Sequence, residues 1–532
     1  MNLPYYKVAL PILFAAFFAL TAQADNLDLI GVRLVHAVTN LNGAGIHVAQ
    51  VEAAGSTTNF EVYPAAAGQP VSLFTYIGTA GSANTYPNSV GTESSHADLV
   101  GAVFYGTVGF GVATNVAHVD NYDANAFVDE IQVGPNYIVT LPATNINDPV
   151  VNSSFTWGSV STNEQKAIDS AYDNYAAQFN TLFVSAACNA SVNVKVSPPG
   201  TAYNCISVAS YRGNSSIGPT PDNGRCKPDI TAPFYADNPD ERGTSFTTPL
   251  VAGAAALLMQ AGLRGDGGSD TNAAFDIRTI KALLLNGAVK PADWTNSNSS
   301  PLDARYGAGV LNVFNACEQL AGGKNNPGAT SLILPGAAHP PVVVTNTVMA
   351  SSGWDFQILA SGATNDAVNH YFFNVSNGAV TATLVWNRHL GEPNINDLDL
   401  FLFNAANSNL VACSTSRVDN VEHLFVPQFA AGRYDLQVLK NGGTNDVGDA
   451  ETYALAWAFV APTLSLAKSG SNATLTWPVY PAGFRVEATT NLLAPVWSTN
   501  NFVLPVITNS RNSLILNVTN AQEFFRLRQP NF

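Results

Sequence analysis

Short apolar runs alternate with longer segments of helical periodicity between about residues 28 and 320. The runs expected to form strands are 46–51, 116–122, 149–155, 181–187 and 205–211. The segments expected to form helices are 96–106, 163–179, 246–262 and 277–288. Apolar strands that alternate with helices predict an α/β domain whose parallel sheet is covered by helices on both faces.

The pattern changes after residues 321–329, where glycine, asparagine and proline predict a linker. From about 340 to 460, alternating strands and turn residues predict an antiparallel β-sandwich. The remainder of the chain is also β-rich, in shorter strands. We therefore expect an α/β domain at 25–322, a β-sandwich at 330–461 and a small β module at 462–532.

The first 24 residues predict a secretory signal peptide. Lys7 precedes an apolar run, and Ala22 and Ala24 occupy the small-residue positions before a cut at Asp25. The run is short for a membrane span, and we expect no later segment to cross a membrane. The expected location is therefore secreted and extracellular.

Charge and cysteine content narrow the choice of partners. The formal net charge of −15 argues against a nucleic-acid partner, because phosphate binding needs a basic face. The five cysteines cannot all pair with one another. Export permits a disulfide between Cys205 and Cys226, and the sequence leaves that pairing open.

The segment RGTSFTTPLVAGAAALLMQ, residues 242–260, places Ser245 at the expected start of a helix. The small residues Gly243 and Thr244 leave the Ser245 side chain exposed, and Pro249 is tolerated only near a helix start. Unpaired N–H groups and the helix dipole favour negative charge there, which suits an acyl-transfer nucleophile. An ordinary N-cap serine is the alternative.

This segment resembles the nucleophile motif of the subtilisin-like serine peptidases, G-T-S-x-A-x-P-x-V-A-G, with Thr247 in place of the alanine. The stretch FVSAACNAS resembles the family's strand that ends in an oxyanion-hole asparagine, which falls on Asn189. Cys188 replaces the usual glycine, and we expect it to narrow the P1 pocket. KPDITAP, residues 227–233, resembles a further family motif. The resemblance implies an acyl-enzyme on Ser245.

The resemblance also implies a base and an acid. SSHADLVGAVFYG resembles the family's H-G-T-H-V-A-G, with His96 as the general base and then acid. Asp98 replaces the threonine of that motif, and Leu99 replaces its second histidine. GAGIHVAQVEAAG resembles the strand that ends in the family's catalytic aspartate, with Glu52 in its place. Glu52 would orient the imidazole and stabilise its charged form.

The glutamate leaves a second function open. If it disables the site, the chain is a catalytically weakened pseudopeptidase that acts as a secreted peptide- or surface-binding protein. Ser245, His96 and Asn189 are all present, and a decayed site has no reason to keep the three together. This favours the enzyme.

The resemblance implies a protein or peptide substrate bound in extended form. Residues 150–158, VVNSSFTWG, resemble the edge strand that pairs with the substrate on the S1–S4 side. Residues 120–125 are expected to form the opposing side. The expected substrate contacts are Ser154, Phe155, Thr156, Asp120 and Asn121.

Residues 330–461 resemble the jelly-roll β-domain that follows the catalytic domain in some secreted bacterial subtilases, through the stretches NDLDL and DNVEH. Asp397 and Asp399 fall on one strand face, where they could bind a structural Ca²⁺ or accept hydrogen bonds from a turn. The chemistry itself requires no cofactor. The last module either contacts a cell surface or polysaccharide or only stabilises the chain.

Overall fold

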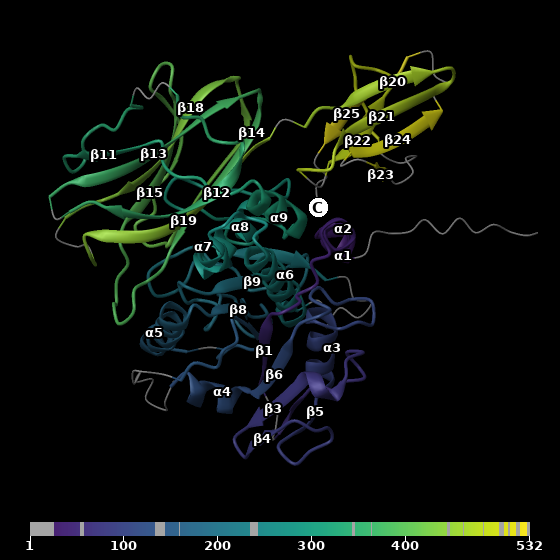
Figure 1. The fold of residues 1–532 in the computed structure, drawn as a ribbon, viewed down its shortest axis with the longest axis vertical. Helices are drawn as coiled ribbons and strands as arrows, with labels where there is room; N and C mark the ends of the chain where they lie inside the picture. Colours follow the sequence, from purple (N-terminus) through teal and green to yellow (C-terminus); the bar gives the residue numbers. More distant parts are fainter. Residues whose placement is uncertain are drawn as a thin grey trace, which may run out of the picture.

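The structure is a computed structural model, and Figure 1 shows its fold. It describes residues 26–53, 58–132, 144–158, 160–234, 243–342, 346–362, 364–443, 447–460, 462–481, 484–498, 505–508, 511–517 and 522–528. The predicted signal peptide, residues 1–24, lies outside the described residues.

An eight-stranded sheet forms the centre of the α/β domain, in the order β10-β9-β8-β7-β1-β6-β3-β4. Its strands are parallel except β4, which pairs antiparallel with β3 at one edge. They are β1 (His47–Glu52), β3 (Phe74–Gly78), β4 (Gly81–Ala83), β6 (His118–Asp123), β7 (Val150–Ser153), β8 (Leu182–Ala186), β9 (Ile206–Tyr211) and β10 (Ile230–Pro233). A separate parallel pair joins β2 (Asn59–Glu61) and β5 (Thr92–Glu93). The predicted parallel sheet is confirmed.

Helices cover both faces of this sheet. On one side, Gln50 of β1 bonds to Ala97 of α3, and α3 packs on α6. The register places Phe183 of β8 on the opposite side, where its ring contacts Phe127 of α4 and Tyr172 of α5. The helices are α1 (Asn26–Leu29), α2 (Val32–Thr39), α3 (Ser95–Phe104), α4 (Ala124–Glu130), α5 (Thr162–Phe179), α6 (Thr244–Arg264), α7 (Thr271–Phe275), α8 (Ile277–Gly287) and α9 (Val313–Ala321), with a 3₁₀ turn at Val71–Leu73.

The predicted antiparallel β-sandwich is also confirmed. One sheet has the order β11-β13-β18-β15-β16 and the other β12-β19-β14-β17. Trp386 and Trp457 are fully buried in the core between the sheets. The strands are β11 (Ala329–Ile333), β12 (Ser352–Ala360), β13 (Asp366–Val375), β14 (Gly378–Trp386), β15 (Leu398–Asn404), β16 (Asn409–Ser414), β17 (Val421–Phe429), β18 (Gly432–Lys440) and β19 (Ala450–Val460).

Figure 1 shows the C-terminal module as a small unit of its own. It contains the sheet β20-β21-β24-β23 and the pair β22-β25, all antiparallel. Its buried core is correspondingly small and consists of Leu475, Trp477, Val486 and Leu514. The strands are β20 (Ser465–Ser469), β21 (Asn472–Pro478), β22 (Arg485–Thr489), β23 (Val506–Thr508), β24 (Arg511–Asn517) and β25 (Phe524–Arg528).

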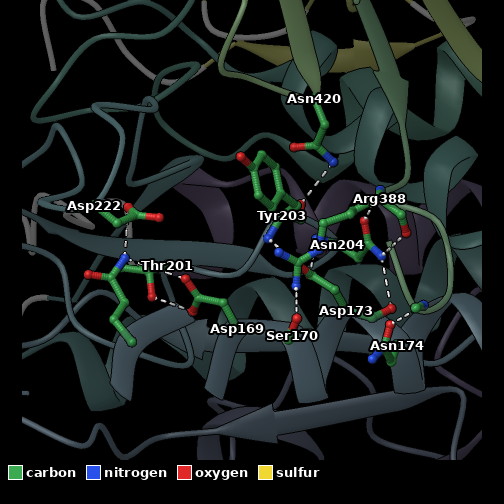
Figure 2. A network of polar contacts seen from close by, with 12 residues as sticks. Asp169, Ser170, Asp173, Asn174, Thr201, Tyr203, Asn204, Asp222, Arg388 and Asn420 are labelled. Carbon is green, nitrogen blue, oxygen red and sulfur yellow. Dashed lines mark hydrogen bonds and ion pairs between the residues drawn. The ribbon is translucent and has the colours of Figure 1, made fainter. Parts of the chain in front are cut away.

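A buried polar network fixes the β-sandwich to the α/β domain (Figure 2). Arg388, in the loop after β14, reaches α5, where its Nη2 lies 2.9 Å from Asp173 Oδ2. Asn204 accepts from the Arg388 N–H at 2.8 Å and donates to the Arg388 carbonyl at 3.0 Å. Asn420 of the sandwich donates to the Tyr203 carbonyl at 3.0 Å. The interface between the two domains therefore contains buried polar groups as well as apolar side chains.

Two expectations from the sequence concern a disulfide and a membrane-spanning segment, and the described residues bear on both. All five cysteines are free thiols, so a disulfide between Cys205 and Cys226 is wrong. Cys205 lies in the core of the α/β domain, whereas the Cys226 N–H faces the sandwich and donates to Asp419. Within the described ranges, α6 alone is long and apolar enough to span a membrane, and it is buried as a core helix.

Candidate active site

The residues predicted to form the site come from the carboxyl-terminal edge of the parallel sheet, where α/β folds commonly place their ligands. Glu52 is the last residue of β1, and Ser154 directly follows β7. Asn189 lies three residues beyond the end of β8. Ser245 is the second residue of α6, which packs on β7, β8, β9 and β10. Strand ends thus supply three of the four positions and a helix start supplies the fourth.

Glu52 and His96 are in direct contact. His96 Nδ1 lies 2.6 Å from Glu52 Oε2. The Glu52 side chain is only 2% exposed, whereas the His96 side chain is 40% exposed. His96 lies in the first turn of α3, which begins after the N-cap residue Ser94, whose hydroxyl accepts from the Ala97 N–H. One ring nitrogen therefore faces a buried carboxylate while the ring remains accessible.

The carboxylate of Glu52 governs the protonation of His96. Burial alone would lower the pKa of His96, but the charge of Glu52 and the hydrogen bond to it raise that pKa above its usual value. On its other side the imidazole packs on Phe246, the residue after Ser245, with 5.3 Å between ring centroids. The ring is thus held between the acid and the start of α6.

The two departures in the His96 motif have local structural roles. Asp98 accepts a hydrogen bond from the Tyr63 N–H at 2.6 Å. Burial, opposed by this bond and reinforced by Glu93, raises the pKa of Asp98 to about 6. Leu99 is partly buried against the core of the domain. Neither residue interrupts the contact between Glu52 and His96.

Ser245 and Ser154 exchange hydrogen bonds. Ser245 Oγ donates to the Ser154 carbonyl at 3.2 Å, and Ser154 Oγ donates to the Ser245 carbonyl at 2.8 Å. The second bond replaces a missing helix bond, because Pro249 has no N–H to give to the carbonyl four residues before it. Among the described residues no hydrogen bond joins Ser245 to His96. In this conformation the Ser245 hydroxyl is therefore bonded to a backbone carbonyl and not to the imidazole.

The amide of Asn189 is held in one orientation by the start of α6. Its Oδ1 accepts from the Thr244 N–H at 2.9 Å and from the Thr244 hydroxyl at 3.1 Å. Because an N–H donor needs an oxygen as its acceptor, the Nδ2 group must lie on the other side of the amide. Gly243 makes this approach possible, since a Cβ there would lie 3.0 Å from Asn189 Oδ1. Across the part of the chain that the structure describes, Nδ2 has no hydrogen-bond partner, and the amide is held by the residue that precedes Ser245.

Cys188 occupies a backbone position that favours glycine. Its φ is +89°, in the left-handed region that side chains disfavour. This conformation gives a physical reason for the glycine of the related motif. The Cys188 side chain is buried, and its Sγ accepts from the Thr156 hydroxyl at 3.5 Å. Cys188 therefore contacts the segment expected to bind substrate.

The segment after β7 has the exposure that a binding strand requires. Phe155 and Thr156 are half-buried, and the Phe155 ring packs on Trp157 with 5.4 Å between centroids. The Trp157 N–H donates to the Pro198 carbonyl at 3.0 Å, which braces the segment from one side. Ser154 instead uses its side chain to support Ser245. Substrate contact by Phe155 and Thr156 stays a prediction.

The structure contradicts the expected substrate contacts on the opposite side. Asn121 is fully buried in β6, where its Oδ1 accepts from the Val62 N–H and its Nδ2 donates to backbone carbonyls. Asp120 pairs in register with Ala49, three residues or about 10 Å before the end of β1. Its carboxylate lies 3.2 Å from His118 Nε2. Both residues lie within the sheet because β6 continues to residue 123.

Asp399 is the second residue of β15, and Asp397 directly precedes that strand. Asn441 Nδ2 donates to Asp399 Oδ2 at 3.0 Å, and the Asn441 N–H donates to the Asp397 carbonyl. Burial and the charge of Asp397 raise the pKa of Asp399 to about 7. Over the described ranges, no three His, Cys, Asp or Glu side chains form a group that could hold a metal ion. The observed contacts fit the turn-binding role.

Sequence reasoning missed two residues that hold the site together. Thr244 orients Asn189 with both its N–H and its hydroxyl. Gln50 Nε2 donates to Glu52 Oε1 at 2.8 Å, so both oxygens of that carboxylate are bonded. A polar residue between the apolar strand residues Ala49 and Val51 was the available signal for Gln50. No comparable signal existed for Thr244.

Comparison with known proteins gives one family match. The model of the subtilase family, Peptidase_S8, matches residues 40–309, about half of the chain. Among solved structures, the serine protease MycP1 of the type VII (ESX-1) secretion system is 16% identical, with 55% of this chain and 87% of that chain covered and a TM-score of 0.32. Tripeptidyl peptidase 2 is 12% identical, with 80% and 52% covered and a TM-score of 0.30. The adhesin domain of Epf from Streptococcus pyogenes is 12% identical, with 33% and 72% covered and a TM-score of 0.17.

Proposed function

Because the chain belongs to the subtilase family of serine peptidases, we propose that it is a secreted endopeptidase that cleaves internal peptide bonds through an acyl-enzyme on Ser245. The observation that carries the proposal is the 2.6 Å contact between His96 Nδ1 and the buried Glu52 carboxylate. A triad needs an imidazole whose Nδ1 is held by a buried acid, so that Nε2 can accept the proton of the nucleophile.

In the proposed reaction, Ser245 Oγ rotates from the Ser154 carbonyl to His96 and gives up its proton as it attacks the substrate carbonyl carbon. His96 then returns that proton to the leaving amine, and the acyl group remains on Ser245. Water, with its proton taken by His96, attacks the ester carbonyl, and His96 returns that proton to Ser245 Oγ as the acid product leaves. Glu52 orients the imidazole and balances the charge that it gains in each half of the reaction.

Asn189 would stabilise the oxyanion of each tetrahedral intermediate. Its Nδ2 is available because Thr244 occupies the other end of the amide. The N–H groups at the start of α6 would add a second source of positive potential. A fixed donor needs no reorganisation when charge develops, and one such donor commonly contributes about 10²–10³-fold to the rate.

The substrate would be an extended protein or peptide chain that pairs with residues 154–158, with Phe155 and Thr156 as its contacts. The Cys188 side chain, in contact with Thr156, would narrow the P1 pocket and favour small P1 residues. The predicted signal peptide at residues 1–24 is the basis for proposing secretion. We further propose that the chemistry needs no cofactor, and that the C-terminal module either attaches the chain to a surface or stabilises it.

The test is hydrolysis of a peptide blocked at both ends, because only an endopeptidase can cleave it internally. We expect the mature full-length chain to cleave the peptide and to react with a fluorophosphonate probe. Ser245→Ala should abolish both signals, whereas Ser465→Ala, at an exposed serine of the C-terminal module, should abolish neither.

The same experiment separates the alternative function. The observation that favours a binding protein is the Ser245 hydroxyl's bond to Ser154 instead of His96. A wild-type chain that neither cleaves peptide nor labels at Ser245, yet binds the intact peptide, would reject the endopeptidase and support the binding protein.

A further inference from the structure

Gln50 is an amide between the apolar residues Ala49 and Val51 of β1, and its side chain is fully buried. Its Nε2 donates to Glu52 Oε1 at 2.8 Å and to the Ala97 carbonyl at 2.9 Å. Because a backbone carbonyl can only accept, Ala97 fixes which end of the amide is nitrogen. The Gln50 oxygen must therefore point the other way.

Tyr105, directly after α3, meets that oxygen. Its hydroxyl donates to Gln50 Oε1 at 2.6 Å, and the whole side chain is buried. The ring packs edge-on against Phe74, with 5.8 Å between centroids. Gly101 on α3 leaves room for the hydroxyl, since a Cβ there would lie 2.8 Å from the Tyr105 oxygen. The donor is thus set in place by the core.

We propose that Gln50 and Tyr105 are positioning residues that hold the Glu52 carboxylate in one orientation, with one oxygen on Gln50 and the other on His96. This inference rests on the proposed role of Glu52 as the orienting acid. A glutamate has one more rotatable bond than the aspartate usual in the family, and ordering it costs more entropy. Fixing its second oxygen removes that freedom, so the longer acid can serve in place of the shorter one.

The arrangement has a measurable consequence for His96. Two donors, Gln50 Nε2 and His96 Nδ1, share one carboxylate. If the Gln50 donor is lost, the carboxylate is less stabilised and attracts the imidazolium proton more strongly. Tyr105 acts one bond further away, because without its hydroxyl the oxygen end of the amide loses its donor and only the bonds at the nitrogen end, to Ala97 and Glu52, still hold it.

Other ionisable groups face this chain of bonds. Tyr76 on β3 and Asp98 on α3 lie near Tyr105, whose pKa is raised well above its usual value by burial and then by these neighbours and Glu52. Asp123 on β6 lies beside Glu52 in the sheet register. These groups are present in every variant that alters Gln50 or Tyr105, so their effect cancels in the comparison.

The test measures the pKa of His96 by NMR of ¹³C-labelled histidine in the full chain carrying Ser245→Ala, which makes the readout independent of catalysis. We expect Gln50→Met and Tyr105→Phe each to raise this pKa by about half a unit, roughly threefold in proton affinity. The control is Tyr76→Phe, which removes another fully buried hydroxyl, bonded at 3.0 Å to the Val62 carbonyl. It should leave His96 unchanged.

In the chain with Ser245 intact, Tyr105→Phe should lower kcat by about threefold to tenfold with KM unchanged, and the acid limb of the pH–rate profile should move to higher pH. A His96 pKa that is unchanged in both Gln50→Met and Tyr105→Phe would overturn the proposal, and so would an equal shift in Tyr76→Phe. If the wild-type chain hydrolyses nothing, the endopeptidase proposal fails separately, and the His96 titration still decides this one.

Discussion

Two buried carboxylates of this chain bind cationic side chains at similar distances but in different surroundings. Glu52 lies 2.6 Å from His96 at the edge of the parallel sheet, and the histidine side chain is 40% exposed. Asp173 lies 2.9 Å from Arg388 at the junction with the β-sandwich, where the arginine is 6% exposed. The first pair belongs to the candidate active site, and the second joins two domains (Figure 2).

The difference between the pairs lies in the proton. An imidazole releases its proton near neutral pH, and the His96 ring is accessible enough to exchange it with a substrate. A guanidinium keeps its protons, so Arg388 can hold a charge but cannot transfer one. A short distance to a buried carboxylate therefore does not identify a catalytic acid. The chemistry and the exposure of the side chain that the carboxylate contacts distinguish a catalytic acid from a structural one.

The largest expected effect comes from removing the charge of the first pair. Glu52→Gln should lower kcat/KM by about 10³–10⁴-fold, because the amide no longer fixes the imidazole tautomer or balances its charge. The free energy of unfolding should change little by comparison. Peptide hydrolysis and urea unfolding of the same preparation measure the two effects. A loss of stability as large as the loss of activity would make Glu52 structural.

The second prediction breaks the other pair. Arg388→Met leaves Asp173 buried without its cation, so the free energy of unfolding should fall by about 3–5 kcal/mol. The kcat of the molecules that remain folded should be retained. Arg305→Met is the matched control, since Arg305 is 66% exposed and lies 3.4 Å from Asp293, and it should cost less than about 1 kcal/mol. Equal losses in the two variants would remove the distinction between buried and exposed pairs.

The third prediction concerns pH. His96 must be neutral to accept a proton, so activity should be lost as pH falls below the raised pKa of His96. Glu52→Gln removes the negative charge that raises the pKa of His96. Burial, which lowers this pKa, then has the larger effect, so the pKa should fall below its usual value. Because the folded-state pKa of the wild type is raised, the stability contributed by the pair is fully present below the unfolded-state pKa and is lost as pH rises through the folded value. Histidine NMR should give a His96 pKa above the usual value in the wild type and below it in Glu52→Gln. Thermal unfolding between pH 5 and 9 should show opposite contributions of His96 to stability in the two proteins.

The smallest expected effect comes from a substitution that shortens the acid and keeps its negative charge. Glu52→Asp keeps the charge but cannot reach both Gln50 and His96 from the same backbone position, so kcat should fall by about threefold to tenfold. A gain in activity would instead mean that the glutamate impairs the site, and that the proposed support by Gln50 is not an adaptation to the longer acid.

Much of the fold could be predicted from the sequence because its strands are nearly continuous apolar runs. The same patterns located Glu52 at a strand end and Ser245 at a helix start. Parallel strands end at one edge, so residues far apart in the sequence were expected to meet there. The pairing of Glu52 with His96 was expected from the resemblance to the family's motifs, and in the structure these two side chains are in contact.

The remainder depended on contacts that no local pattern encodes. Arg388 and Asp173 are more than two hundred residues apart, and nothing in either segment indicates the other. The φ of Cys188 follows from the path of the loop after β8, not from its own side chain. Asn121 was expected in the groove from the resemblance alone, and the contacts that bury its side chain, with Val62 and Phe60, come from a segment that no local pattern connects to it.

The position of Arg388 also bears on how this architecture could evolve. A domain joined only by a flexible linker can be exchanged between genes as an independent cassette. Here a loop of the β-sandwich supplies the cation that pairs with Asp173 and two of the three backbone partners of the Asn204 side chain. A recombination point between residues 322 and 329 would leave those groups unmatched, so the two domains should be inherited together and should diverge in concert.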